Sequence, residues 1–242
     1  MLVIKILFPI LFYSLSVSFF LMILPSCSAL AVTGISSFFA SPVLYACYRK
    51  DQKKRGVHHE ISLKLKKDIL WILLLSFSSA VAFNNLLSFP VLHRLFPAYE
   101  STVSKELYLP PLYQQLLCTV ILIPCAEELC FRAHIFAPLR EYYPFWSAAL
   151  FSALAFGAYH GNVLQAIYAF LLGLLIAWIY EQYNTFWAAF LFHAGANLLA
   201  VLFTHWKILE PGKTPSSLIL AAMACSLFLM AVCIRFIKRS SS

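Results

Sequence analysis

The feature that most limits how this chain can fold is a series of long, almost uninterrupted apolar runs. Windows of about 20 apolar residues have the length that a helix needs to cross a bilayer. Of the 242 residues, 62% are hydrophobic and only 12% are charged. A soluble core of this size could not bury that much apolar surface. The sequence therefore predicts an all-α, polytopic bundle of about eight transmembrane spans, near 6–24, 28–48, 69–89, 112–138, 144–160, 163–181, 185–206 and 216–237.

The order of the runs predicts one membrane domain. They are continuous rather than alternating over about ten residues, which argues against a transmembrane β-barrel. The connections are short except for 49–67 and 90–111, and the sequence contains no internal repeat. We therefore expect residues 1–242 to form a single integral-membrane domain. The first run, with Lys5 before it and Ala29-Leu30-Ala31 after it, resembles a signal peptide, and we interpret it as an uncleaved span.

The positive charge of the chain predicts its orientation. Eight of the 18 basic residues lie between Arg49 and Lys67, which is typical of a cytoplasmic connection. Eight spans then place both termini in the cytoplasm, and 13 basic residues on that side against four outside: Arg94, Lys105, Lys207 and Lys213. The net charge of +8 is thus explained by the membrane and its anionic lipids, and we expect no nucleic-acid partner. The short loops favour a bacterial plasma membrane.

Charged residues in the middle of the fourth run are the first indication of function. Glu127, Glu128 and Arg132 lie in the segment Leu122-Ile-Pro-Cys-Ala-Glu-Glu-Leu-Cys-Phe-Arg132. A charge at the bilayer centre costs roughly 3 kcal/mol, so such residues usually face a bundle interior or a wet cavity. Glu128 and Arg132 are four residues apart and can pair on one helix face. That pair alone could simply fix helix packing, but Glu127 points elsewhere and is left available for chemistry.

The residues around this acidic pair point to a pocket rather than to thiol chemistry. Pro124 removes a helix hydrogen bond just before the pair, so we expect a kink there that opens a wet pocket. Cys125 and Cys130 flank the pair, and we interpret them as small buried hydrophobes because nearby carboxylates disfavour a thiolate. The seven cysteines form neither a paired extracellular framework nor a CxxC metal motif.

Two further polar positions occur in later runs. The fifth run ends at His160, in Phe156-Gly-Ala-Tyr-His160, and the seventh carries His193 and Asn197 four residues apart on one face. Each alone could be an interfacial residue or an interhelical polar contact. A His/Asn pair that projects into a bundle could equally donate hydrogen bonds to a developing oxyanion.

The three motifs together resemble a known family. Glu127-Glu128-x-x-x-Arg132, Phe156-x-x-x-His160 and His193-x-x-x-Asn197 occur in this order in three separate spans. This pattern is similar to that of the CPBP intramembrane glutamic endopeptidases, which include type II CAAX prenyl proteases and bacteriocin-processing or self-immunity proteins. The motifs occupy roughly residues 112–200, within an expected catalytic core of roughly residues 112–206, and spans one to three carry no motif of the family.

The resemblance implies a role for each motif residue. Glu127 and His160 would activate a water molecule, while His193 and Asn197 would stabilise the tetrahedral oxyanion. Glu128 and Arg132 would give structural and electrostatic support. The substrate would be a membrane-associated peptide or protein, of the prenylated CAAX type in one branch of the family. A zinc site of Glu127, His160 and His193 is the alternative, but no HExxH motif is present, and we expect catalysis without a metal or cofactor.

Two rival functions and one geometric difficulty remain at this point. The same polar cluster could assemble a non-catalytic membrane scaffold or bacteriocin immunity protein, or relay protons in a small transporter. The difficulty concerns depth: a straight fifth span would carry His160 about 24 Å across the membrane, whereas His193 would lie only about 12 Å deep. A tilted helix, or a fourth span that ends early with 133–145 at the interface, would bring the two together.

Overall fold

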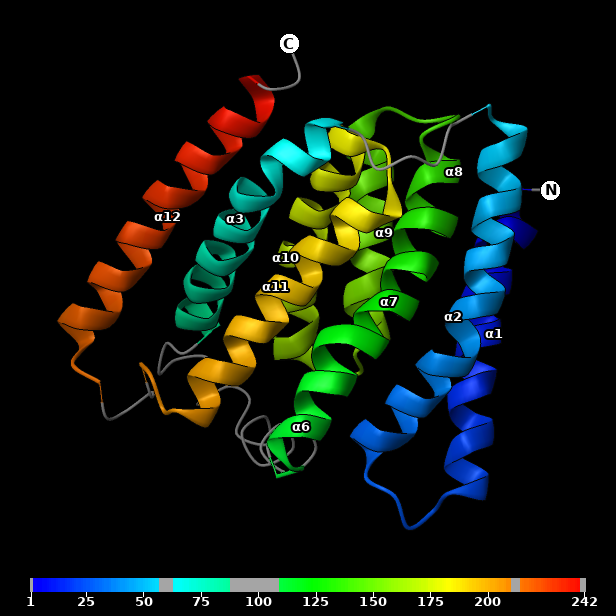
Figure 1. Cartoon of the computed structure of the whole chain (residues 1–242), viewed down its shortest axis with the longest axis horizontal. Helices are drawn as coiled ribbons and strands as arrows, with labels where there is room; N and C mark the ends of the chain where they lie inside the picture. Colours follow the sequence, from blue (N-terminus) through cyan, green and yellow to red (C-terminus); the bar gives the residue numbers. More distant parts are fainter. Residues whose placement is uncertain (1, 57–62, 88–108, 210–213, 240–242) are drawn as a thin grey trace.

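The computed structural model describes residues 2–56, 63–87, 109–209 and 214–239, and every regular element in these ranges is a helix (Figure 1). The prediction of an all-α, polytopic transmembrane bundle is confirmed. Most of the predicted connection 90–111, part of the basic connection 49–67, and Arg94, Lys105 and Lys213 lie outside the described residues.

Within the described residues, six helices are long and apolar enough to cross a membrane: α1 (Leu2–Ile23), α2 (Ala29–Lys54), α3 (Leu63–Leu87), α10 (Val163–Tyr183), α11 (Phe186–His205) and α12 (Ser216–Arg239). The fifth predicted span is the shorter helix α9 (Phe145–Tyr159). The fourth is continuously helical but changes its winding. Its α-helical parts are α6 (Leu112–Gln115), α7 (Ile123–Glu128) and α8 (Ala137–Leu139), separated by the π-helical segments η2 (Leu116–Leu122) and η3 (Leu129–Phe136).

The basic connection between the second and third spans is more helical than predicted. Helix α2 continues to Lys54 and α3 begins at Leu63. Most basic residues of the connection therefore belong to one of these two helices and lie beyond its apolar run. Ion pairs fix this end of the bundle, because Asp51 on α2 binds Lys5 on α1 at 3.0 Å, and Arg55 binds Glu141 at 2.8 Å. The two ends of the chain lie toward this same end (Figure 1).

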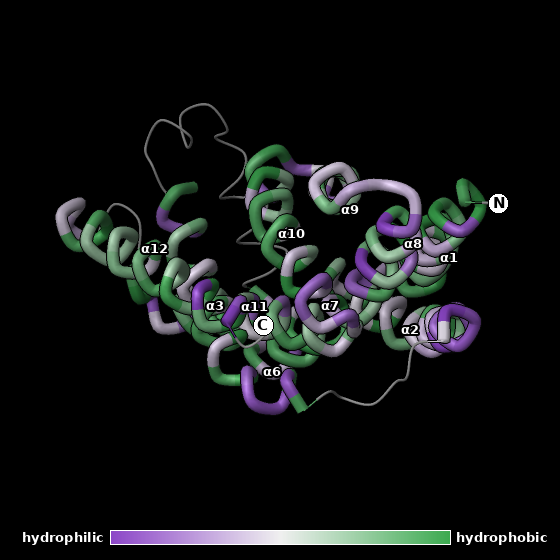
Figure 2. The backbone as a smooth tube through the Cα atoms, turned by 90° about the horizontal axis from the view of Figure 1, so that it is seen from above, coloured by the Kyte–Doolittle hydropathy of each residue, from purple (hydrophilic) through white to green (hydrophobic). Residues whose placement is uncertain are grey.

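The outward surface of the bundle is apolar, as a membrane protein requires. Phe228 on α12 is 73% exposed, and Phe19, Leu154 and Trp146 are also largely exposed. Figure 2 shows hydrophobic colouring along the outer helix α10 and hydrophilic colouring on α7, in the middle of the bundle. The polar residues of the fourth span therefore lie inside, where they avoid lipid.

Prolines account for the changes of winding in the fourth span. Each π-helical segment ends two residues before a proline, Pro124 or Pro138. A proline has no amide N–H, and its ring clashes with the carbonyl four residues earlier. A wider π turn is one way in which a helix continues past such a residue, and these turns are frequent at functional sites. The structure thus has π turns and an unbroken helix where the sequence predicted a kink.

Glycines allow the helices to approach closely around the fourth span. At Gly157, an added Cβ atom would lie 2.7 Å from the Ala166 carbonyl oxygen, so α9 and α10 pack backbone to backbone. Gly195 lies directly against the hydroxyl of Ser76 on α3. Small residues at helix contacts are typical of membrane bundles, because interhelical packing rather than burial from water drives association.

Candidate functional site

The charged residues of the fourth span form a buried pair that is tied to two other helices. Glu128 and Arg132 are fully buried, and their side chains are 3.3 Å apart, as the four-residue spacing predicted. Arg132 also donates to the Gly173 carbonyl of α10 at 3.2 Å, and its guanidinium group lies 4.5 Å from the centre of the Phe156 ring of α9. The pair therefore connects three elements of the bundle, and Glu127 is not part of it.

His193 contacts both glutamates. Its Nδ1 atom lies 2.7 Å from Glu128 Oε1, and its Nε2 atom lies 3.9 Å from Glu127 Oε2. An ionised carboxylate only accepts hydrogen bonds, so Nδ1 carries a proton and donates a hydrogen bond to Glu128. The other nitrogen then faces Glu127. The link between Glu128 and His193 was not predicted, since two residues 65 positions apart on different helices share no sequence pattern.

His160 is oriented by its own helix. It is the C-cap residue of α9, and its Nδ1 atom lies 2.8 Å from the Phe156 carbonyl oxygen four residues earlier. A carbonyl oxygen only accepts, so Nδ1 is again the donor, and in the neutral ring the lone pair is on Nε2. Gly161 then turns the chain with a φ of +65°, and Asn162 caps the start of α10. The hairpin between α9 and α10 thus presents a proton acceptor.

The two imidazoles lie against the same aromatic ring and line the same cavity, despite the depth difference predicted from straight spans. The ring of Phe156 lies edge to face with both, with ring centres 4.9 Å from His160 and 5.6 Å from His193. Helix α9 has only 15 residues, about 22 Å in length, and is too short for a full crossing. The fourth span does not end early at 133, because it remains helical and buried to Leu139.

Asn197 completes the group through a contact with the fourth span. Its Nδ2 atom donates to the Thr119 carbonyl oxygen at 2.8 Å. An amide nitrogen has two N–H groups, so one of them remains available. Because a carbonyl cannot donate, this contact also decides which way the Asn197 amide is turned.

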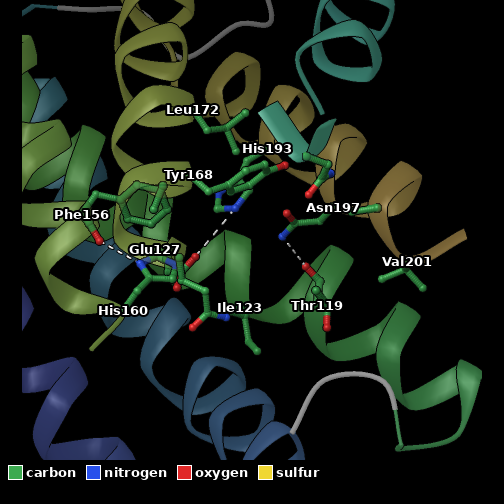
Figure 3. Close-up of a pocket in the computed structure, with 14 residues that line it drawn as sticks. Thr119, Ile123, Glu127, Phe156, His160, Tyr168, Leu172, His193, Asn197 and Val201 are labelled. Carbon is green, nitrogen blue, oxygen red and sulfur yellow. Dashed lines mark hydrogen bonds and ion pairs between the residues drawn. The ribbon is translucent and has the colours of Figure 1, made fainter. Parts of the chain in front are cut away.

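A cavity of about 230 Å³ lies among these side chains (Figure 3). This volume is enough for several water molecules. Glu127, His160, His193 and Asn197 all line it, whereas Glu128 and Arg132 lie behind its wall. Sequence reasoning missed several other lining residues that belong to no motif: Asn84, Thr119, Ile123, Gln165, Tyr168, Leu172, Ala200 and Val201.

The arrangement suits acid–base chemistry on a water molecule. A carboxylate and an imidazole can take and return protons, and an amide N–H can bind an oxyanion. Within the described parts of the chain, no group of three or more His, Cys, Asp or Glu side chains has an arrangement that could hold a metal ion. All seven cysteines are free thiols, and Cys130 contacts the Pro9 carbonyl through its sulfur.

Comparison with known proteins gives one match. A model of the family described as type II CAAX prenyl endopeptidase Rce1-like matches residues 110–199. No curated protein and no solved structure matches the chain. The matched segment runs from the start of the fourth span to the seventh and includes all seven residues of the three motifs that the sequence singled out. Over residues 110–199, this integral membrane protein is therefore similar to the type II CAAX prenyl endopeptidase Rce1-like family.

Proposed function

We propose that the protein is an intramembrane endopeptidase that hydrolyses a peptide bond with a water molecule held between Glu127 and His160. One observation carries this proposal: Glu127, His160, His193 and Asn197, from three different spans, line one cavity of about 230 Å³ inside an apolar bundle. A purely structural ion pair would need neither the cavity nor Glu127. The family match supports the same reaction class.

The orientation of His160 fits a role in proton transfer. Its Nδ1–H is held by the Phe156 carbonyl, so the unprotonated Nε2 can accept a hydrogen bond from water. Glu127 lies beside the same hollow in Figure 3. As the water attacks the scissile carbonyl carbon, its proton passes to the Glu127 carboxylate. The protonated pair then delivers a proton to the leaving amine.

The oxyanion of the tetrahedral intermediate would be bound by His193 and Asn197. The Nδ1–H of His193 already donates to Glu128, so His193 can donate to an oxyanion only through a protonated Nε2. We therefore propose that His193 is an imidazolium ion in the active form. The cluster of two glutamates, Arg132 and this imidazolium would then carry no net charge, which suits a site surrounded by lipid.

The substrate that we propose is a membrane-associated peptide or protein, with a lipid-modified CAAX-type C-terminus as one candidate. The cavity has apolar walls at Leu172, Ala200 and Val201 next to the polar group, so it can accept an extended peptide with apolar side chains. We further propose that catalysis needs no metal and that both termini face the cytoplasm of a bacterial cell.

The test is a cleavage assay of the detergent-purified protein on a panel of membrane-tethered peptides, prenylated and unprenylated. Glu127→Gln should abolish cleavage and leave the protein folded, because the amide keeps the size but cannot take a proton. Glu181→Gln is the matched control, since Glu181 pairs with Arg140 outside the cavity. Exhaustive chelation should leave the rate unchanged if no metal takes part.

Different results would favour other functions. A Glu127→Gln variant that keeps its biological activity would refute hydrolysis and indicate a scaffold or immunity protein. Loss of cleavage on chelation, restored by zinc, would replace the proposed mechanism by a metal-dependent one.

A further inference from the structure

The hydrogen bond that holds Asn197 depends on an irregularity of the fourth span. In an α-helix, the Thr119 carbonyl would accept from the amide four residues later, which is that of Ile123. The Ile123 N–H instead donates to Cys118, five residues earlier, because η2 has π-helical hydrogen bonds. The Thr119 carbonyl is thereby released from its usual α-helical partner.

The next helical partner is missing as well. In the π pattern, the Thr119 carbonyl would accept from the residue five positions later, and that residue is Pro124, which has no amide N–H. Neither backbone partner is therefore available to this carbonyl. The side-chain amide of Asn197 donates to it at 2.8 Å and satisfies it. The contact is partly buried, and inside a membrane bundle an unsatisfied carbonyl is costly, so this hydrogen bond also stabilises the fold.

We propose that Pro124 is a positioning residue for the reaction. Because Pro124 has no N–H at the end of the π turn, the Thr119 carbonyl stays free to accept the hydrogen bond of Asn197. This hydrogen bond turns the second N–H of Asn197 toward the oxyanion. This inference rests on the proposed function, in which Asn197 is an oxyanion donor. The segment Pro124-Cys-Ala-Glu127 then serves the reaction in two ways. Pro124 orients Asn197 on the seventh span, and Glu127 takes the proton of the water.

The first test is a kinetic comparison of Asn197→Ala with Pro124→Ala. Removal of one oxyanion donor typically lowers kcat by roughly 100-fold or more, and we expect that loss for Asn197→Ala. In Pro124→Ala, a new N–H competes for the Thr119 carbonyl and Asn197 is released, so we expect kcat to fall by at least roughly tenfold with little change in KM. Introduced into Asn197→Ala, Pro124→Ala should cause no further loss.

A backbone ester separates the missing N–H from the proline ring. Lactic acid, the hydroxy analogue of alanine, placed at position 124 by nonsense suppression has neither an N–H nor a ring, and it should restore the kcat that alanine loses. Pro138→Ala is the matched control, because Pro138 follows the second π-helical segment in the same way, but no residue of that segment, Leu129–Phe136, lines the cavity. It should leave kcat close to that of the wild type.

The outcomes separate this inference from the proposed function. Low activity of Asn197→Ala with normal activity of Pro124→Ala would overturn the positioning role alone, as would an ester variant that remains slow or losses that add in the double variant. Full activity of Asn197→Ala would refute the oxyanion role and this inference with it. If Pro124→Ala does not fold, the ester variant decides: wild-type kcat supports the inference, and a kcat as low as that of Asn197→Ala overturns it.

Discussion

Replacement of Glu128 by glutamine should lower the free energy of unfolding by an amount that the geometry of the ion pair sets. Glu128 and Arg132 are both fully buried and 3.3 Å apart. At an effective dielectric constant of about 20, their attraction is roughly 5 kcal/mol. Removal of one partner of a buried pair usually costs about 3–5 kcal/mol, because the other charge stays buried. Arg132 keeps the Gly173 carbonyl and the Phe156 ring, so we expect a loss of about 3 kcal/mol.

A second substitution distinguishes this cause from a general packing defect. In Glu128→Gln/Arg132→Met, no unpaired charge remains in the interior, and most of the lost stability should return. Activity should not return, because His193 still lacks the carboxylate that holds its Nδ1–H. Stability and catalysis are therefore expected to separate in this double variant.

The assay is unfolding of the detergent-solubilised protein by added SDS, followed through the fluorescence of its five tryptophans, with peptide cleavage measured in parallel. The reasoning is refuted if the double variant is no more stable than Glu128→Gln, since the cost would then not come from the unpaired arginine. It is also refuted if Glu128→Gln unfolds like the wild type.

Two further predictions concern packing and orientation. Gly195→Val should lower stability by roughly 1–3 kcal/mol in the same SDS titration, because the new side chain meets Ser76 across the contact between α11 and α3, while Gly195→Ala should cost less; equal stability of all three proteins would contradict the close approach. Cys27, exposed in the turn between α1 and α2, should react with a membrane-impermeant maleimide in intact cells. A cysteine introduced at Gly56, in a variant without Cys27, should react only after lysis. The reverse labelling would show that the proposed topology is inverted.

The membrane spans could be predicted from the sequence because the bilayer imposes a simple length and polarity rule. The pairing of Glu128 with Arg132 was equally accessible, since four residues make one turn of a helix. The ends of α2 and α3 were not, because charged residues beyond the hydrocarbon core are compatible with either a loop or a helix. Hydropathy sets where a helix must exist and leaves open how far it continues into water.

The contacts across helices could not be predicted, for a different reason. Pro124 was visible in the sequence, but the choice between a kink and a π turn depends on whether a neighbouring helix supplies a hydrogen-bond donor to the released carbonyl. The Asn197 amide, 78 residues away in the sequence, is that donor. The contact of His193 with Glu128 likewise depends on the rotation of α11, which is set by packing, including the close approach of Gly195 to Ser76.

The physics of a membrane bundle also explains why residues that hold the helices together lie next to the residues that we propose for catalysis. Lipid is as apolar as the helix surfaces, so apolar contacts alone give little preference for one arrangement of helices. The contacts of Arg132 with Gly173 and Phe156, and of Glu128 with His193, instead link the fourth span to α9, α10 and α11. These helices, together with α3 through Asn84, line the cavity. Loss of Glu128 should therefore damage both fold and rate, whereas loss of Glu127, which is outside this set of contacts, should damage the rate alone.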